Sequence, residues 1–290
     1  MHAIEIINVS KEFKGKKGAV VEAVKGLSLA IDQGEVFGFL GPNGAGKSTT
    51  LKILMGLIAP TSGHASILGT DSQSYLSRKY VGYLPEHPAF YDYLTAYEYL
   101  AFVGRTFQMA KTVLAEKSEY FLKLLDLWNV RQRPISGYSK GMVQRLGIAQ
   151  VLIHDPAVYI LDEPMSGLDP IGRALVKDII LELKKRGKCV FFSTHITSDV
   201  ETVCDRVGII VKGTLRCVER VASLMREGVV GYHLYIKDKN SFDVKEVYVT
   251  KDQLPAFIQE TQVQEQEITM IEPRRKNLED FFLGIVREQK

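Results

Sequence analysis

Gly41-Pro42-Asn43-Gly44-Ala45-Gly46-Lys47-Ser48-Thr49 is the stretch of this sequence with the most specific local pattern. It follows the apolar run Val36–Leu40, which is typical of a buried strand, and it precedes a run with helical character from Thr50 to Gly56. A strand, a glycine-rich loop and a helix in this order form the context of a phosphate-binding P-loop. The glycines let the backbone wrap around an anion with its N–H groups pointing inward, and the helix directs the positive end of its dipole to the same place. The stretch therefore predicts that the chain binds ATP or GTP.

Two side chains of this loop have specific roles in such a site. Lys47 adds a full positive charge for the β- and γ-phosphates of a nucleotide, and the Ser48 hydroxyl can ligate Mg²⁺. The alternative interpretation is a glycine-rich turn that carries an unrelated lysine. The strand before the loop and the helix after it favour the phosphate-binding interpretation.

Composition places the chain among ordinary globular proteins. Hydrophobic residues make up 46% of the 290 residues and charged residues 24%, and this length allows one large domain or two small ones. The net charge of +3 is too small to indicate nucleic-acid binding by itself. Cys189, Cys204 and Cys217 lie in or beside apolar segments without CxxC spacing, so we expect buried reduced thiols in a cytosolic protein. We expect no signal peptide, and no apolar run approaches the roughly 18 residues of a membrane-spanning helix.

Strands and helices alternate along most of the chain, which predicts a mainly parallel α/β sheet. The expected strands are Ile4–Val9, Leu27–Ile31, Val36–Leu40, His64–Leu68, Val158–Leu161, Cys189–Ser193 and Val207–Val211. Helices are expected over residues 170–186 and Ile196–Cys204. One helical pattern also runs from Thr95 to about Leu127, and another helix begins near Gly141. We therefore expect residues 95–154 to form a helical lobe inserted into the sheet domain.

The character of the sequence changes near Gly228, and we expect a main domain over residues 1–225 and a small α+β accessory region over residues 226–290. Its expected elements are the strands His233–Ile236 and Val247–Thr250 and the helices Asp252–Gln262 and Leu278–Val286. From Gly228 onward the chain has 9 Lys or Arg and 11 Asp or Glu, a net charge of −2. This balance argues against a nucleic-acid-binding tail.

Two carboxylates follow the apolar run Val158–Leu161. In a P-loop protein, a carboxylate at the carboxyl end of a neighbouring strand lies beside the phosphates, where Mg²⁺ must be held. Asp162 is therefore a candidate for the metal and its waters, and Glu163 is a candidate to orient or deprotonate the attacking water. The alternative is a strand that ends in a solvated acidic turn, and the P-loop upstream disfavours it.

Two further segments begin predicted helices. In Ser166–Pro170, Asp169 fits a helix N-cap with Pro170 at the first helical position. In Ser139–Arg145, the Ser139 hydroxyl and free backbone N–H groups at a helix start could bind an anion. On that segment alone, a plain Ser N-cap is the better interpretation.

His195 lies two residues after the end of the predicted strand Cys189–Ser193, with Thr194 between them. A single histidine is more often structural than functional. At the carboxyl end of a parallel strand beside phosphates, however, it is a credible contact for the γ-phosphate.

These segments together resemble the nucleotide-binding subunit of an ATP-binding cassette (ABC) transporter over roughly residues 4–220. The resemblance rests on five motifs in the family's order, which are Gly41–Thr49, Ser139–Leu146, Leu161–Pro164, Ser166–Pro170 and His195. It implies a P-loop cassette with a RecA-like core, an antiparallel β subdomain and an inserted helical subdomain. The segments around Tyr83–Glu86 and Tyr138–Met142 are most similar to the ATPases of ABC-2 exporters.

The resemblance implies that ATP and Mg²⁺ are bound and that two copies form a head-to-tail homodimer. Each ATP would lie between the P-loop of one copy and the Ser139 segment of the other. Ser139 and the backbone of Gly141 would bind the γ-phosphate across the dimer, and Asp169 would connect the two sites. Phe13 falls where the family places an aromatic that stacks on adenine. Lys47, Ser139, Glu163 and His195 are then the catalytic candidates, and Ser48, Glu86 and Asp162 are the metal candidates.

The sequence departs from the usual family pattern at several of these positions. Tyr138, Lys140 and Met142 differ from the usual Leu-Ser-Gly-Gly-Gln motif, in which Ser139 and Gly141 match. Glu86 stands at the position usually held by a glutamine that senses Mg²⁺ and the membrane partner. Phe13 replaces the usual tyrosine, which keeps the stacking face and loses the hydroxyl.

We therefore expect an ATPase that powers an exporter through separate membrane subunits, located peripherally at the cytoplasmic face of the cell membrane, with no nucleic-acid partner. The alternative is a soluble cassette ATPase that acts in DNA repair or translation. Relatives of that class carry a long coiled-coil insertion or two cassettes in one chain, and this sequence has neither. A GTPase-type switch explains neither the Ser139 segment nor His195.

Overall fold

A computed structural model describes residues 2–15, 19–226, 229–238, 243–264, 266–275 and 277–287 of the chain. It divides into two compact units, Met1–Val218 and Glu219–Lys290, which are described separately below. The boundary predicted from the sequence lay between residues 225 and 226, inside the second unit. The sequence also predicts a glycine- and lysine-rich turn over Lys14–Gly18, and residues 16–18 of this turn lie outside the described residues.

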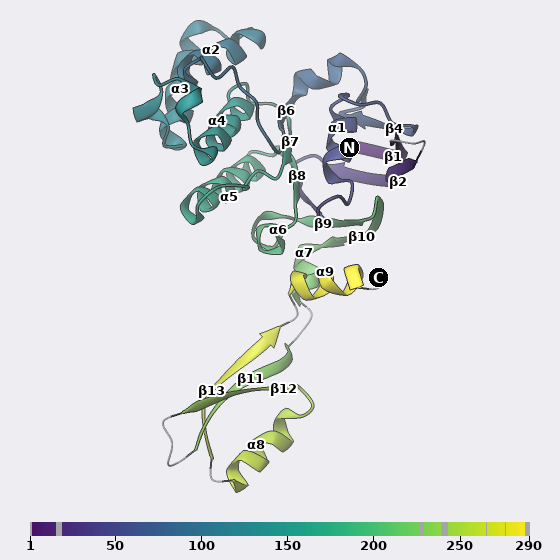
Figure 1. Ribbon diagram of the computed structural model, residues 1–290, viewed down its shortest axis with the longest axis vertical. Coiled ribbons are helices and arrows are strands. Elements are labelled where there is room, and N and C mark those ends of the chain that lie inside the picture. Colours follow the sequence, from purple (N-terminus) through teal and green to yellow (C-terminus); the bar gives the residue numbers. More distant parts are fainter. Residues whose placement is uncertain are drawn as a thin grey trace. The chain divides into compact units, whose positions relative to one another are not determined.

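A six-stranded sheet forms the centre of the first unit (Figure 1). Its strands, in spatial order, are β10 (Thr214–Arg220), β9 (Arg206–Val211), β3 (Val36–Leu40), β8 (Cys189–Thr194), β7 (Val158–Asp162) and β6 (Val81–Leu84). Strand β3 pairs in parallel with β8 and β9, and β7 pairs in parallel with β6 and β8. Every residue of β3, β7 and β8 is buried, as expected for continuous apolar strands covered on both faces. The parallel sheet predicted from the sequence is confirmed.

An antiparallel sheet packs beside it, in the order β2 (Val20–Asp32), β1 (His2–Lys14), β4 (Ser62–Ile67) and β5 (Thr70–Asp71). One hydrophobic core joins this sheet, helix α1 (Lys47–Leu54) and the parallel sheet, with Ile4, Leu51 and Phe191 among its fully buried members. β1 and β2 extend well beyond the strands predicted at Ile4–Val9 and Leu27–Ile31. Asn8 and Gly26 have positive φ angles, and the pairing register shifts between Ile6 and Val9, so the alternation that reveals a strand is interrupted.

The helical segment contains α2 (Ala96–Thr106), α3 (Lys111–Leu124) and α4 (Lys140–Leu152), which lie across the six-stranded sheet from β1, β2 and β4 in Figure 1. The prediction of one continuous helical run from Thr95 to Leu127 is wrong. α2 starts at a capping box between Thr95 and Glu98, and it ends where Gln108 takes a φ of 54°. Apolar residues keep helical spacing through both helices, which is why periodicity alone did not separate them.

Helices α5 (Pro170–Lys185) and α6 (Thr197–Val203) follow β7 and β8, close to the predicted bounds. A 3-10 helix η2 (Tyr75–Tyr80) and the strands β5, β6 and β10 were not predicted. Short 3-10 helices η3 (Trp128–Val130) and η4 (Ile135–Gly137) lie between α3 and α4 in the chain. Cys189 and Cys204 are buried and Cys217 is half-buried, and none of these three residues forms a disulfide. None of the helices in the described ranges combines the length and the apolar character needed to cross a bilayer.

The second unit contains α7 (Val221–Arg226), β11 (Val229–Asp238), β12 (Val244–Thr250), α8 (Leu254–Val263), β13 (Gln266–Arg275) and α9 (Leu278–Arg287). Its strands form an antiparallel sheet in the order β12-β11-β13. Leu234, Ile236 and Val249 are buried in its core, and Phe257 of α8 packs against them. The unit is α+β, as expected, although β13 and α7 were not predicted.

Candidate active site

The glycine-rich loop connects β3 to α1 and surrounds a pocket of about 240 Å³. Residues 43–49 line the pocket together with Ala23, Glu86 and Glu163. Gly46, the residue before α1, has a φ of 107°, and a Cβ there would collide with the carbonyl oxygen of Ala23. A Cβ on Gly41 would lie 2.5 Å from the carbonyl oxygen of Ile210. The loop can therefore close around the pocket only with glycine at these positions.

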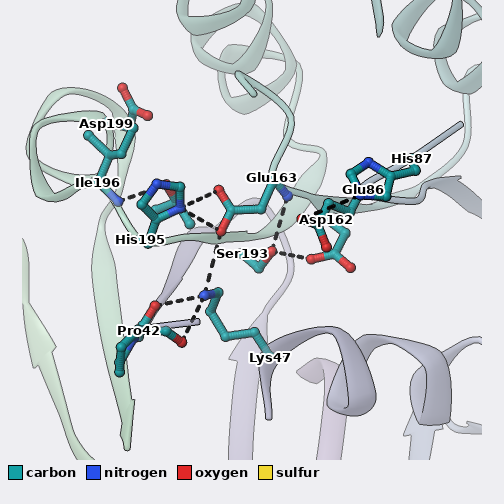
Figure 2. Close-up of polar contacts among 12 residues, drawn as sticks. Pro42, Lys47, Glu86, His87, Asp162, Glu163, Ser193, His195, Ile196 and Asp199 are labelled. Carbon is teal, nitrogen blue, oxygen red and sulfur yellow. Dashed lines mark hydrogen bonds and ion pairs between the residues drawn. The ribbon is translucent and has the colours of Figure 1, made fainter. Parts of the chain in front are cut away.

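Lys47 is buried in this loop, with only 6% of its side chain exposed. Its Nζ donates hydrogen bonds to the carbonyl oxygens of Gly41, at 2.6 Å, and Pro42, at 3.3 Å. Nζ also lies 3.5 Å from Oε1 of Glu163 (Figure 2). A buried ammonium needs such partners, and they hold its charge at the wall of the pocket.

Glu163 follows the last residue of β7, and its carboxylate points toward both Lys47 and His195 (Figure 2). Its backbone N–H donates to the carbonyl oxygen and the Oγ of Ser193 on the neighbouring strand β8. Both carboxylate oxygens lie 3.0 Å from Nδ1 of His195, whose side chain is 49% exposed. Three residues that are distant in sequence therefore meet because β3, β8 and β7 are neighbours in the sheet. The ends of parallel strands place them together, as the sequence led us to expect.

Asp162, the last residue of β7, is almost fully buried and accepts a hydrogen bond from the Ser193 hydroxyl. Burial and the negative charge of Asp162 together raise the pKa of Tyr83 on β6 to about 12. Of the three metal candidates, Ser48 and Glu86 belong to the pocket wall, whereas Asp162 is buried and does not belong to the wall as described. No group of three or more His, Cys, Asp or Glu side chains in the described parts of the chain could hold a metal ion alone. The hard oxygen donors of Ser48 and Glu86 suit Mg²⁺ if phosphate oxygens supply further ligands.

Ser139 and Gly141 lie at the start of α4 and do not belong to the described wall of the P-loop pocket. Ser139 is the N-cap of α4, and its Oγ accepts a hydrogen bond from the N–H of Met142 at 3.3 Å. A Cβ on Gly141 would lie 3.4 Å from the carbonyl oxygen of Gly167, so this helix start is adjacent to the loop before α5. The N-cap interpretation of Ser139 is correct as local structure.

Asp169 is the N-cap of α5, as predicted, and belongs to the same neighbourhood as Ser139. Its Oδ1 accepts hydrogen bonds from the N–H of Gly172 at 2.9 Å and from Arg145 at 3.2 Å. The Gly172 hydrogen bond, followed by the charge of Arg145, lowers the pKa of Asp169. Within one chain, the structure thus places the Ser139 and Asp169 segments together, and neither belongs to the described wall of the pocket.

Phe13 lies near the end of β1, where it pairs with Val21 of β2. Its side chain is 41% exposed, and Lys11 Nζ lies 5.2 Å from the ring centre. Ala23, two residues after Val21, belongs to the pocket wall, whereas Phe13 does not belong to the wall as described.

Two residues at the site were missed by the sequence analysis. Ser193 holds the backbone of Glu163 and the carboxylate of Asp162, and its place at the end of a predicted strand was the available signal. Gln144 is buried on α4, and its Nε2 donates to the carbonyl oxygens of Glu163 and Pro164. The sequence carried no local signal for Gln144, because its partners are about 20 residues away.

Residues 24–166 match the family model described as ABC transporter. The uncharacterized ABC transporter ATP-binding protein YxlF of Bacillus subtilis is 39% identical over 287 residues, which cover 91% of this chain and 95% of that protein. This chain belongs to the family of ABC transporter ATP-binding proteins. The resemblance stated from the motifs is therefore confirmed.

Two further comparisons support this assignment. An uncharacterized ABC transporter ATP-binding protein of Synechocystis, sll0415, is 47% identical over 222 residues, which cover 75% of this chain and 62% of that protein. The chain thus spans less than two thirds of that relative's length. The dimeric post-hydrolysis structure of the ATP-binding cassette MJ0796, bound to ADP and Pi, matches with a TM-score of 0.70 at 24% identity, over 75% of this chain and 98% of that one. This likeness confirms the cassette fold, and the family favours the transporter interpretation over DNA repair or translation.

Proposed function

We propose that this ABC transporter ATP-binding protein binds and hydrolyses ATP with Mg²⁺ to power an exporter of the ABC-2 type. The observation that carries the proposal is the meeting of Lys47, Glu163 and His195 at a pocket formed by the P-loop. A fixed ammonium, a buried carboxylate and a histidine around a phosphate-sized anion site are the groups that phosphoryl transfer to water requires.

Each residue has a defined task in this proposal. Lys47 and the N–H groups of the P-loop bind the β- and γ-phosphates, and they stabilise the charge that develops during transfer. Glu163 orients and deprotonates the attacking water, and His195 contacts the γ-phosphate beside it. Ser48, Glu86 and Asp162 would hold Mg²⁺, which would neutralise phosphate charge. Phe13 stacks on the adenine ring.

We infer that two copies complete the site by associating head to tail. Ser139 and Gly141 present a helix N-terminus, which attracts anions, yet they lie outside their own P-loop pocket. A second copy facing this one would bring the Ser139 segment to the γ-phosphate of the first, with Asp169 at the contact between the copies. The dimeric state of the cassette MJ0796 supports this arrangement.

Exposed aromatic residues near Glu86 provide the proposed contact with membrane subunits. Tyr91, Tyr93 and Phe102 are at least half exposed, and the Tyr91 ring centre lies about 6 Å from both of the other two. Contiguous exposed aromatics commonly mark protein interfaces. Because this surface follows the pocket residue Glu86 in sequence, a membrane subunit bound there would sense the closure of the dimer on the nucleotide. The chain would then lie at the cytoplasmic face of the membrane.

Phosphate release and nucleotide binding by the purified full chain test the enzymatic part of the proposal. We expect Mg²⁺-dependent ATP hydrolysis in the wild type and weakened nucleotide binding in Lys47→Ala. Lys52→Ala, which changes a lysine in the last turn of α1, is the matched control and should bind ATP normally. Equal ATP binding by wild type and Lys47→Ala would show that the pocket is not the nucleotide site.

A further inference from the structure

Gln144 of α4 has a buried side-chain amide that hydrogen-bonds to the loop after β7. It lies one turn into α4, five residues after the N-cap Ser139, and it is 3% exposed. Its Nε2 donates to the carbonyl oxygen of Glu163 at 3.3 Å and to that of Pro164 at 3.0 Å. The Glu163 carbonyl oxygen also accepts a hydrogen bond from the N–H of Ser166, which closes a tight turn.

The backbone of Glu163 needs such support because its φ is 50°. The left-handed region is costly for a residue with a Cβ, and non-glycine residues remain there only when their surroundings fix them. On one side, Ser193 accepts the N–H of Glu163; on the other, Gln144 holds its carbonyl oxygen. This conformation turns the carboxylate toward Lys47 and His195.

Close packing fixes the position of α4 beside this loop. A Cβ on Gly147 would lie 2.6 Å from the Leu84 side chain and 3.1 Å from Pro88, so α4 and the segment that carries Glu86 pack directly against each other. Arg145, the neighbour of Gln144, binds Asp169, the N-cap of α5. The amide of Gln144 is therefore presented by a helix that cannot shift without moving these contacts.

We propose that Gln144 is a positioning residue for ATP hydrolysis, because its amide fixes the turn that aims the Glu163 carboxylate into the P-loop pocket. The inference rests on the proposed function of Glu163 as the group that activates water. Under this inference, α4 connects two parts of the site. Its Ser139 segment is proposed to meet the partner copy's nucleotide, and its Gln144 holds Glu163 of its own copy. A shift of α4 on dimer closure would thus reach Glu163 through one side chain.

The test replaces Gln144 by methionine in the full chain, which keeps the approximate volume and removes the donor. Loss of the donor removes the hydrogen bonds to the carbonyl oxygens of Glu163 and Pro164, so the turn that aims the Glu163 carboxylate is no longer fixed. A displacement of about 1 Å at a catalytic group costs roughly 100-fold in rate. We expect kcat to fall by roughly 10- to 100-fold while the ATP Kd changes by less than about threefold. Gln150→Met is the matched control, because Gln150 lies on the same helix and its bond goes to the Tyr99 hydroxyl instead. It should keep kcat within about twofold of the wild type.

Combining the substitution with Glu163→Gln separates positioning from a general loss of structure. If Gln144 acts through Glu163, Gln144→Met should reduce the residual rate of Glu163→Gln by less than about twofold. A full additional loss in that background, or a Gln144→Met kcat equal to that of Gln150→Met, would overturn the inference. Gln144→Leu, which also removes the donor, replaces Gln144→Met under the same criteria if the latter does not fold. If the wild type binds no ATP, the proposed function itself is refuted. This result is distinct from the results that would refute the inference about Gln144.

Discussion

Replacing Glu163 by glutamine keeps the shape of the side chain and removes its charge at the point where three groups meet. The carboxylate is 9% exposed and lies 3.0 Å from Nδ1 of His195 and 3.5 Å from Nζ of Lys47. A positioned general base contributes about 10²- to 10⁴-fold to a rate. Because each tenfold corresponds to about 1.36 kcal/mol, we expect kcat to fall by that factor and the barrier to rise by about 2.7 to 5.4 kcal/mol.

Nucleotide binding should not weaken in this variant. The carboxylate is a negative charge in the wall of a pocket that receives a triphosphate, so its removal should leave ATP affinity unchanged or higher. Slow hydrolysis with intact binding should trap an ATP-bound dimer, which size-exclusion chromatography with ATP would detect.

Phosphate release at saturating ATP is the assay, and Glu182→Gln is the matched control. Glu182→Gln makes the same chemical change on the surface of α5, where the Glu182 side chain is 62% exposed. We expect this control to turn over at the wild-type rate. Full turnover by Glu163→Gln would refute the role that we assign to Glu163, because no other carboxylate of the pocket wall as described touches both Lys47 and His195.

Three further predictions concern the partner contact, the metal and pH. Ser139→Ala should lower hydrolysis at least tenfold, or about 1.4 kcal/mol, and leave ATP binding by the monomer intact in calorimetry; loss of monomer binding would contradict the head-to-tail assignment. Glu86→Gln should raise the Mg²⁺ concentration for half-maximal hydrolysis by roughly tenfold, because a carboxylate leaves the pocket wall; an unchanged Mg²⁺ titration would remove Glu86 from the metal site. Burial lowers the pKa of His154, so near the usual histidine pKa of about 6.5 the unfolded chain binds more protons at this side chain than the folded chain does. The stabilisation that is present above about pH 6.5 should therefore be lost as the pH falls below that value. Urea unfolding should show a smaller pH dependence in His154→Phe, which retains an aromatic partner for Phe107; an equal dependence would assign it to other groups.

The parts of the site that could be predicted are those encoded in contiguous residues. The P-loop needs a strand, glycines and a helix in sequence, and Gly46 has the left-handed backbone that such a loop requires. The pair Asp162 and Glu163 directly follows an apolar strand, so its place at the sheet edge could be inferred.

What could not be predicted depends on contacts between distant segments. The bonds from Gln144 to Glu163 and Pro164 join α4 to the end of β7, and no local pattern encodes them. The break between α2 and α3 depends on the left-handed Gln108, a residue without a strong turn signal. β13 pairs with β11 across about 40 residues of chain, and its alternation is interrupted by a register shift.

Affinity purification from membranes in mild detergent tests the transporter role most directly. The full chain would be recovered with and without ATP, and its partners would be identified and counted by mass spectrometry. We expect to recover a polytopic membrane protein in near one-to-one ratio with this chain. We also expect that Tyr93→Ala, at an exposed aromatic of the proposed contact surface, reduces this recovery and spares ATP binding. Recovery of ribosomes, of DNA or of the free protein alone would contradict the transport role and leave the ATPase site standing without it.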